Sequence, residues 1–505
     1  MDRTKALKHA AGSTNSSGGS SGSAVSPKVD KCNLPLIPQP SEDPLDPLNW
    51  PSWLKLLVLA EISLFTLLSV LTASMITPSF QILSREFGRE IEEIAYITSI
   101  FILTAGCSAG FWNPIANVYG RRPVYLISVA ACIALLVASG RARTYAELMA
   151  FRALNGFFGG VPLGLGSATV CDMYFEHERG RYLGIYTLSL ITGGHLAPVI
   201  GGYIERDLQW RWCFYVSGIL MSPLLPLFVF ALPETLYSRH AEASQTIGEA
   251  TWKQNLLLAR TRYPLRRIHV LDFLRPWQML KYSSVLLPTM YYSASFAYGS
   301  ILFVITAAPI FGKLYHYEPY QTGLLLGLPL TIGSILGELM AGAFSDFVSE
   351  KRALVRGGKR KPEDRLLALT PAIVLLPLGI LLEGVCIQHG THWSGIAVSI
   401  GIASLGLQIQ TTVLYAYTAE CYRQQAAEIG SLFSVCRAIF SFCMGFYALR
   451  LGESIGFQDA WIVFSVIVVA LSVPVLALLC TGERWRQESV DGADLHYNNT
   501  VSGNP

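Results

Sequence analysis

The chain alternates between long apolar stretches and short polar segments. Each apolar stretch is close to the ~20 residues that an α-helix needs to cross the hydrocarbon core of a bilayer. The stretches are dense in Gly, Ala, Ser and Pro, which suits helices that pack closely in a membrane. The pattern predicts twelve membrane-spanning helices, at residues 54–78, 91–113, 123–140, 145–171, 180–204, 212–232, 285–311, 321–345, 366–389, 392–418, 429–450 and 459–481.

A long polar interruption divides the twelve stretches into two sets of six. We therefore expect a first six-helix half at residues 51–232 and a second at 285–481, joined by a linker at 233–284. Residues 1–50 contain a Ser- and Gly-rich stretch that is too polar to bury a core, so this segment is predicted to be disordered. Residues 482–505 form a polar tail. The predicted fold class is an all-α integral membrane protein of two six-helix halves.

The composition supports this class and narrows the partners. Hydrophobic residues make up 51% of the 505 positions and charged residues 14%, against about 25% charged residues in soluble domains. The net charge of +3 does not indicate the excess of basic residues that is typical of nucleic-acid-binding proteins. The ten Cys lie mostly in apolar runs rather than as paired loop residues, which argues against a disulfide framework or a zinc site. The expected partner is the lipid bilayer.

The basic residues in the predicted loops indicate an orientation. If both termini are inside, the internal loops carry 20 Lys and Arg residues and the external loops carry 8. Cytoplasmic loops of membrane proteins hold the excess of positive charge. We therefore expect both termini and the 233–284 linker to be cytoplasmic.

The sequence offers no catalytic motif in a structured context. It has no phosphate-binding GxxxxGK[ST] loop and no HExxH, and its GxSxG match, GGSSG at residues 18–22, lies in the Ser- and Gly-rich stretch that is predicted to be disordered. His389 and His392 form a pair in a predicted external loop and are expected to be solvated rather than to bind a metal. We therefore expect no enzyme activity, no catalytic residues, no metal and no cofactor or ATP site.

Charged side chains inside the spans are the informative residues, because each is costly in hydrocarbon unless it is paired or faces water. Those inside or at the ends of spans are Glu61, Arg152, Glu338, Glu383, Arg437, Asp172 and Glu420. Two interpretations of Arg152 and Arg437 stay open, a structural pairing inside the bundle or a place on a substrate or proton pathway. Glu61 and Glu383 lie within two turns of a predicted span end, so we expect them to reach the membrane interface.

Several motifs together resemble one family. DPLNW precedes the first span, NPIANVYGRRPVYL follows the second, and YAYTAECY and SLFSVCRAIFSF lie near the tenth and eleventh spans. In this order they resemble the major facilitator superfamily, in particular its fungal drug:proton antiporter branch with twelve spans. The resemblance covers the chain from about residue 43 to about residue 482. It implies a secondary active transporter with substrate bound between two pseudo-symmetric halves.

The loop after the second span resembles the superfamily's gating motif but departs from it twice. Gly120, Arg121 and Arg122 match the motif, whereas Asn113 stands where the family has Gly and Asn117 where it has Asp. In the family this Asp joins a charge-relay latch that favours the outward-facing state. Asn117 keeps the hydrogen-bonding capacity without the charge, which implies a weaker latch.

The second half carries equivalents that the resemblance also assigns to gating. The loop GAFSDFVSEKR after the eighth span retains Asp346, and Glu420 lies at the matched end of the tenth span. Arg437 matches a position of the branch's eleventh span. These matches imply a parallel internal repeat.

Two motifs inside the first half complete the resemblance. Arg152 in RALNGFFGG matches the fourth-span motif, in which a buried Arg is thought to influence proton transfer. The fifth span reads GGHLAPVIGG, similar to the antiporter motif, with Pro198, Gly201 and Gly202 matching and Ala197 in place of Gly. Small residues here would let the fifth and eighth helices approach and slide as a gate.

Polar and aromatic residues at mid-span are candidates for the substrate site. His195 on an apolar helix fits either a functional group or a hydrogen-bonded core residue, and Tyr291 and Tyr292 fit either a site or interface packing. Gln408 and Gln410 are two residues apart and so point to different faces, which leaves at most one in the cavity.

The signs of the deep charges suggest a substrate class. Glu338 is expected to be an isolated carboxylate that could titrate on burial, whereas the two deep Arg residues suit a carboxylate substrate. We therefore expect a proton-coupled exporter of a small organic acid such as a di- or tricarboxylate, monomeric and in the plasma membrane. The alternatives are efflux of drugs, toxins or secondary metabolites, import of a polyamine or other nutrient with protons, and a vacuolar or other internal membrane.

Overall fold

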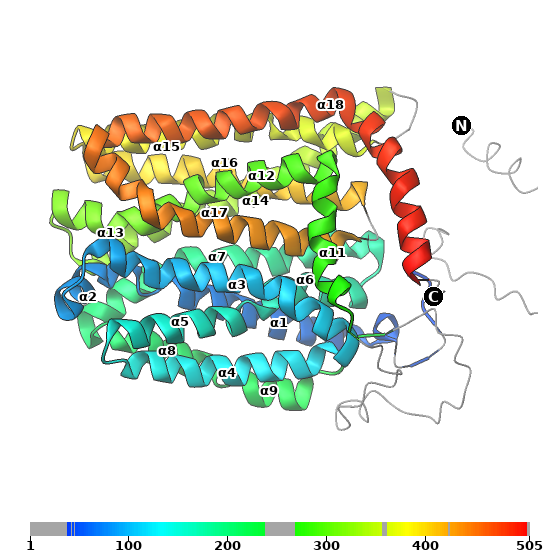
Figure 1. Ribbon diagram of the computed structural model, residues 1–505, viewed down its shortest axis with the longest axis horizontal. Helices are drawn as coiled ribbons and strands as arrows, with labels where there is room; N and C mark the ends of the chain where they lie inside the picture. Colours follow the sequence, from blue (N-terminus) through cyan, green and yellow to red (C-terminus); the bar gives the residue numbers. More distant parts are fainter. Residues whose placement is uncertain are drawn as a thin grey trace, which may run out of the picture.

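The structure, a computed structural model, describes residues 38–237 except 42 and 45, 268–355, 361–422 and 425–501. The regular elements of these residues are helices. Twelve of the described helical segments are long and apolar enough to cross a membrane, and they run side by side in one bundle (Figure 1). This confirms the predicted all-α membrane fold. The largest difference in bounds is in the first span, whose helical segment continues to Phe87.

The first six spans form one half of the bundle, and three of them are interrupted helices. Their elements are α1 (Ser52–Ser74), η2 (Thr77–Ser79) and α2 (Phe80–Phe87) in the first span, α3 (Ile91–Tyr119), α4 (Arg121–Arg141), α5 (Tyr145–Gly159) with α6 (Val161–Met173), α7 (Glu176–Leu208), and α8 (Arg211–Met221) with α9 (Leu224–Ala231).

The other six spans form the second half in the same way. Their elements are α12 (Ser283–Phe296) with the π-helical turn η4 (Ala297–Ile301) and α13 (Leu302–Leu314), α14 (Pro319–Val355), η5 (Pro362–Leu369) with α15 (Thr370–Gln388), α16 (Trp393–Cys421), α17 (Ala426–Ile455) and α18 (Phe457–Val501).

Local signals in the sequence explain several helix ends. α5 begins with a capping box, in which Thr144 Oγ1 accepts from the Glu147 backbone N–H and the Glu147 side chain accepts from the Thr144 N–H. The tight connection from α3 to α4 passes through Gly120 at φ 101°, a conformation that side chains disfavour. The glycine of the gating motif is thus required by the backbone itself.

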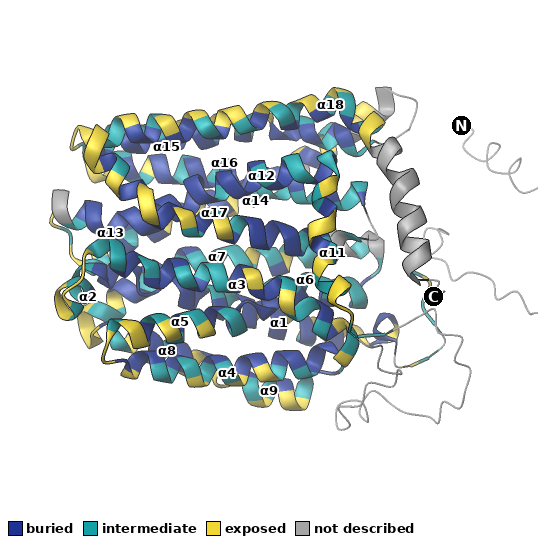
Figure 2. Ribbon diagram, in the orientation of Figure 1, coloured by how far each residue is buried: buried dark blue, intermediate teal, exposed yellow. Residues whose placement is uncertain are grey.

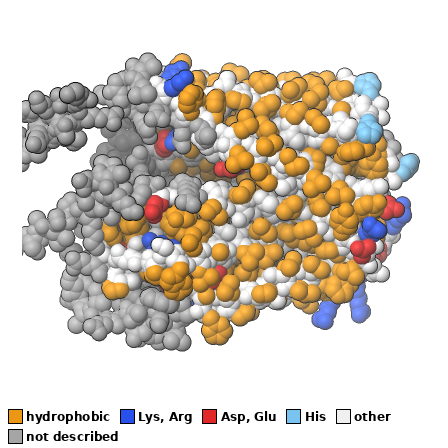
Figure 3. All heavy atoms as spheres, turned by 180° about the vertical axis from the view of Figure 1, so that it is seen from behind, with side chains coloured by type: hydrophobic (Ala, Val, Ile, Leu, Met, Phe, Trp, Pro, Cys, Tyr) orange, Lys and Arg blue, Asp and Glu red, His pale blue; other side chains and the backbone are white. Residues whose placement is uncertain are grey.

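The two halves meet along two helix pairs, α3 with α17 and α7 with α14. Each of these four helices buries the face that meets its partner, and α4, α9, α15 and α18 lie at the outside of the bundle and expose many residues (Figure 2). The exposed outer residues include large apolar side chains such as Phe230, Leu339 and Val473. Hydrophobic side chains cover the flank in Figure 3 and charged ones gather toward an end of the bundle. This is the surface expected of a protein in lipid.

The two ends of the bundle carry different connecting turns. The motif end carries the Gly120 turn and the junction between the halves, and the opposite end carries the turns at Gly88 and Gly456. Helix α11 (Val270–Gln278) lies across the motif end, roughly perpendicular to the spans (Figure 1). It contacts α3 and α17, with the Phe273 ring 5.8 Å from that of Phe111. Part of the predicted polar linker is therefore helical and packed against both halves.

Candidate substrate site and gates

The two halves are joined at the opposite end of the bundle. Arg450 Nε on α17 lies 2.5 Å from Glu92 Oε2 on α3. Gln81 Nε2 on α2 donates to the carbonyl oxygen of Ala308 on α13 at 3.1 Å. An ion pair and a hydrogen bond between the halves, at residues next to the connecting turns, close this end of the path between them.

The α7–α14 contact continues this closure through glycines. A Cβ on Gly202 would lie 2.7 Å from both the Pro319 carbonyl oxygen and Tyr320 Cα, and a Cβ on Gly323 would lie 2.1 Å from the Pro198 carbonyl oxygen. Real Cβ atoms do not approach this closely, so the two backbones meet only because both positions are glycine. Pro198 and Gly202 of the antiporter motif therefore lie at the interface between the halves.

Gly201, the third matched residue of this motif, faces a different helix. A Cβ on Gly201 would lie 1.8 Å from the Met75 carbonyl oxygen at the end of α1. Ala197, which replaces the usual glycine, is fully buried. The motif thus fixes α7 on two sides, against α14 through Gly202 and against α1 through Gly201, and only the first contact joins the two halves.

We expect Gly202→Ala to prevent closure of the opposite end and to reduce transport to near background at normal protein abundance. The methyl group would overlap backbone atoms, which cannot move as a flexible side chain can. Gly184→Ala on the same helix is the control, because its Cβ would meet nothing within 4 Å. Equal transport by the two variants would show that close packing at Gly202 is not needed.

His195 forms a polar contact between the halves, close to this interface. Its Nδ1 is 3.1 Å from Ser334 Oγ on α14, and Ser334 Oγ is 2.8 Å from Ser404 Oγ on α16. The Ser404 hydroxyl also lies 2.8 Å from the Leu330 carbonyl oxygen. His195 is 7% exposed. The structure therefore places this candidate in a hydrogen-bonded contact across the interface.

Glu338 lies one turn along α14 from Ser334 and is not the isolated carboxylate that was expected. Its Oε2 accepts from Gln408 Nε2 at 2.6 Å and from Thr412 Oγ1 at 2.7 Å, both on α16. Glu338 is partly exposed. Gln410 points away from this group and donates to the Tyr291 carbonyl oxygen at 3.5 Å. Gln408 and Gln410 do take different faces, as their spacing predicted.

Arg437 on α17 lies among aromatic rings. Its guanidinium is 4.4 Å from the centroid of the Phe296 ring, and Nη1 donates to Tyr292 Oη at 3.4 Å. Tyr292 packs edge-on against Tyr415 at 5.4 Å. Tyr186 of α7, which belongs to the first half, lies within electrostatic range of Arg437. We call this group, Arg437 with Tyr186, Tyr292, Phe296 and Tyr415, the Arg437 cluster.

The Arg437 cluster has unused binding capacity. Arg437 is partly exposed although it lies in the middle of its span, and its Nε, which is buried, has no hydrogen-bond partner among the described residues. The other tyrosine candidate, Tyr291, is buried at 1% exposure and its hydroxyl is unpartnered. A partly exposed guanidinium beside aromatic rings of the second half can bind an acceptor group of a substrate.

Arg152 occupies a different environment. It is fully buried, and its guanidinium donates to the carbonyl oxygens of Thr72 at 3.0 Å, Ala73 at 2.8 Å and Ile97 at 3.3 Å. α1 ends at Ser74, shortly before a proline, so Thr72 and Ala73 are in the last turn, where carbonyls lack helical partners. Arg152 thus caps the end of α1 and satisfies its carbonyls.

The two deep arginines therefore do not line a common binding site for a carboxylate substrate in this structure. Arg152 contacts helices of the first half and has no accessible surface, whereas Arg437 contacts a separate set of residues. Of the two interpretations of a mid-span arginine, structural pairing describes the contacts of Arg152 and a place on a substrate pathway fits those of Arg437.

The gating loop is held by a residue that the sequence did not single out. The Glu234 carboxylate, just after α9, accepts from the backbone N–H groups of Arg121 at 2.9 Å and Arg122 at 3.1 Å. Arg121 Nη1 lies 2.9 Å from Asp172 Oδ2, and Arg122 Nη2 donates to the Val229 carbonyl oxygen at 2.7 Å. The anionic side chain at the N-terminus of α4 is favourably placed for the helix dipole. In the sequence, the position of Glu234 within LPET, directly after an apolar run, was the feature that could have indicated this role.

The two asparagines of the gating motif differ from the expectation. Asn117 is exposed and makes no hydrogen bond within the described part of the chain, so it does not replace the hydrogen bonds of the family's aspartate there. Asn113, at the motif's glycine position, instead donates from Nδ2 to Ser431 Oγ on α17 at 2.5 Å. The polar contact between the halves near this end thus lies one turn along α3 from the expected residue.

In the second half, Glu420 is engaged as part of a local cluster. Its Oε1 lies 2.8 Å from Arg365 Nε, and Arg365 Nη1 donates to Ser345 Oγ at 3.1 Å. In the sequence, Arg365 was only one of the 20 basic residues of the predicted internal loops. The side chain of Asp346 lies outside the described residues.

Glu61 and Glu383 do not reach the membrane interface, which corrects the expectation for both. Glu61 is 1% exposed and Glu383 is 2% exposed. Glu383 Oε2 accepts from Trp461 Nε1 on α18 at 2.7 Å, whereas neither oxygen of Glu61 has a partner. Both side chains point into their own half, because the rotation of each helix places them against neighbouring helices.

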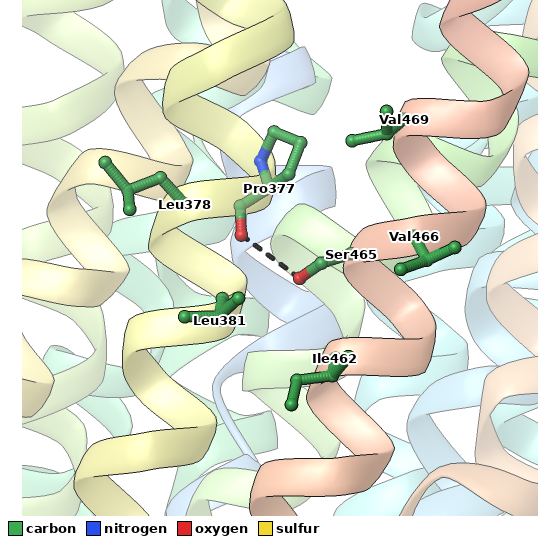
Figure 4. A pocket seen from close by; sticks show the side chains of 7 residues that line it. All are labelled: Pro377, Leu378, Leu381, Ile462, Ser465, Val466 and Val469. Carbon is green, nitrogen blue, oxygen red and sulfur yellow. Dashed lines mark hydrogen bonds between the residues drawn. The ribbon is translucent and has the colours of Figure 1, made fainter.

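A groove on the outside of the bundle is not the substrate site. It has a volume of about 260 Å³ and is lined by α15 and α18 with Pro377, Leu378, Leu381, Ile462, Ser465, Val466 and Val469 (Figure 4). Ser465 Oγ donates to the Pro377 carbonyl oxygen at 3.1 Å, so the polar atom of this lining side chain is already satisfied. The groove lies within the second half and suits lipid rather than a polar solute.

The comparisons with known proteins agree with this architecture. The sequence profile described as Major Facilitator Superfamily matches residues 62–445, which is more than half of the chain. An uncharacterised transporter of Schizosaccharomyces pombe is 28% identical, with 83% of this chain and 86% of the relative covered. A probable efflux pump of Aspergillus flavus is 24% identical (82% and 97% covered), and an efflux pump of Penicillium aethiopicum is 28% identical (82% of each covered).

The chain is thus a multi-pass membrane protein with the fold of a transporter. It belongs to the major facilitator superfamily, a family of transporters rather than of enzymes.

Proposed function

We propose that this transporter exports a small organic metabolite in exchange for protons. The Arg437 cluster carries the proposal, because it offers a partly exposed guanidinium in the middle of the membrane, beside aromatic rings of the second half and within electrostatic range of Tyr186 in the first half. Several relatives are named efflux pumps, which supports export over import. The closed opposite end and the glycine contacts of α7 and α14 supply one gate of an alternating-access cycle.

The chemistry of the Arg437 cluster favours an aromatic or unsaturated acid over the di- or tricarboxylate expected from the sequence. One guanidinium can pair with one acidic or phenolic group, and the neighbouring rings can pack on a planar frame. A dicarboxylate would need a second cation, and Arg152 has no accessible surface to provide it. This substrate class also fits efflux of secondary metabolites, the second candidate function. Import of a polyamine is less favoured because the Glu338 carboxylate already accepts two hydrogen bonds.

Metabolite profiling tests the proposed function. Deleting the gene should leave one or more aromatic acids accumulated in cells and depleted from the medium, and expressing it in a yeast host should restore their efflux. Efflux should fall when a protonophore removes the proton gradient. An unchanged metabolite profile in medium and cells would contradict export, and depletion from cells instead of accumulation would indicate import.

We propose further that the motif end is cytoplasmic, because the predicted loops there carry most of the 20 basic residues counted inside against 8 outside. A protease-sensitive tag inserted at 233–284 is expected to be protected in intact cells and cleaved after permeabilisation. A tag in the turn at Gly88 should already be cleaved in intact cells. Cleavage of the 233–284 tag from outside intact cells would overturn the orientation and, with it, the assignment of the closed end as external.

A further inference from the structure

Glu61 is a buried carboxylate with no partner for either oxygen. It lies on α1, is 1% exposed, and neither Oε1 nor Oε2 has a hydrogen-bond partner among the residues that the structure describes. Val58 and Phe65 are on the same face of the helix, one turn to either side, and both are fully buried. Glu61 therefore points into the interior of the first half and not toward lipid.

The rings next to Glu61 are committed to other contacts. Phe65 packs edge-on against Tyr125 of α4 at 6.4 Å and Phe228 of α9 at 5.7 Å. The Tyr125 hydroxyl is 3.1 Å from Thr169 Oγ1. Within the described ranges of the chain, no charged side chain pairs with Glu61.

The cations of α1 and of the helices packed against it are engaged elsewhere. On α1 itself, Lys55 Nζ donates to the Leu48 carbonyl oxygen at 2.9 Å. Arg152 of α5 caps the end of α1, and Arg121 of α4 pairs with Asp172 of α6. A neutral donor on α7 is engaged as well, because the Tyr186 hydroxyl donates to the Pro162 carbonyl oxygen at 2.6 Å. Glu61 thus has neither a counter-ion nor a donor.

A carboxylate in this position must be neutral, because an ionised group buried without partners is far more costly than a protonated one. A protonated carboxyl with both oxygens unpartnered still destabilises the packing, whereas leucine would not. From this geometry we infer that Glu61 is a proton-carrying residue of transport. It holds a proton while the first half is packed as in this structure, and gives it up when α1 moves enough to admit water.

The position of Glu61 on α1 connects it to the gate. α1 packs chiefly on α7 within its own half, and its end touches Gly201 of α7 through the Met75 carbonyl oxygen. Gly202, the next residue, contacts α14. A shift of α1 that follows deprotonation of Glu61 would therefore displace α7 at the α7–α14 interface. The carboxylate takes its proton from water on one side of the membrane and returns it to water on the other.

This inference rests on the proposed proton exchange, and its test is independent of the substrate. Hydrogen exchange of α1 and α7 is measured across a pH series, after correction for intrinsic exchange, on the full-length protein in liposomes. We expect wild type to show a pH-dependent step in protection and Glu61→Gln to keep the protected level at every pH. Glu383→Gln is the matched control, because Glu383 is equally buried but accepts from Trp461, and glutamine can still accept that bond. This control should retain the step.

A pH step that persists in Glu61→Gln, or that is absent from wild type, would overturn the inference. If Glu61→Gln fails to fold, wild type is treated with dicyclohexylcarbodiimide, which modifies protonated carboxyls in apolar surroundings, and the adduct is located by mass spectrometry. Labelling of Glu61 that declines as pH rises is expected, and no labelling at any pH would contradict a protonated Glu61. A wild-type pH step without any proton-dependent export would instead refute the proposed function and leave Glu61 as a titrating group.

Discussion

Arg437→Gln is expected to abolish most efflux of acidic substrates while leaving protein abundance near that of wild type. Glutamine keeps a hydrogen-bond donor but loses the charge, and the neighbouring rings of Tyr292 and Phe296 stay in place. Removing one partner of a buried charged pair costs about 2–5 kcal/mol. Since about 1.4 kcal/mol corresponds to a factor of ten, the apparent affinity for an acidic substrate should fall more than tenfold.

The sign of the substrate is tested with the same variant. Efflux of an acid, a neutral compound and a cation of similar ring size is compared in wild type, Arg437→Gln and Arg437→Lys at matched protein level. Lysine keeps the charge, so it should retain part of the acid efflux, whereas Arg437→Gln should transport the neutral compound or the cation as well as or better than wild type. If efflux of every acid is unchanged in Arg437→Gln, Arg437 is a structural residue, and neutral metabolites or drugs become the better substrate class.

Arg152→Lys is expected to impair transport and to lower thermal stability. The guanidinium donates to three carbonyl oxygens on two helices, and a lysine ammonium cannot reproduce that planar arrangement. Each buried carbonyl left unpaired costs about 1–3 kcal/mol. The end of α1 that Arg152 holds also touches α7 at Gly201, so a loosened α1 should disturb the gate.

Thermal unfolding in detergent, measured beside efflux at matched surface abundance, checks this expectation. Arg89→Lys is the control, since Arg89 forms a solvent-exposed ion pair with Glu93 of the kind that contributes little. A lower midpoint only in Arg152→Lys supports the capping role. Unchanged stability with lost transport would instead indicate that Arg152 acts on the proton or substrate pathway directly.

The sequence alone determined the membrane class, the twelve spans and their division into two halves. A membrane helix satisfies its own backbone hydrogen bonds and its length is fixed by the bilayer, so local hydropathy is sufficient to locate it. The motif glycines Gly120 and Gly202 lie at a backbone turn and at a close backbone contact, and both situations require a glycine that is visible in the sequence.

Only the tertiary structure decided what the deep charges contact. Position along a span does not give the rotation of the helix or the identity of its neighbours, so Glu61 and Glu383, expected at the interface, are buried, and only Glu383 has a partner. Arg152 and Arg437 looked equivalent in the sequence, yet one caps a helix end and the other lies among aromatic rings of the second half. Contacts between residues far apart in the chain depend on how helices pack, and the sequence of a single helix does not determine that packing.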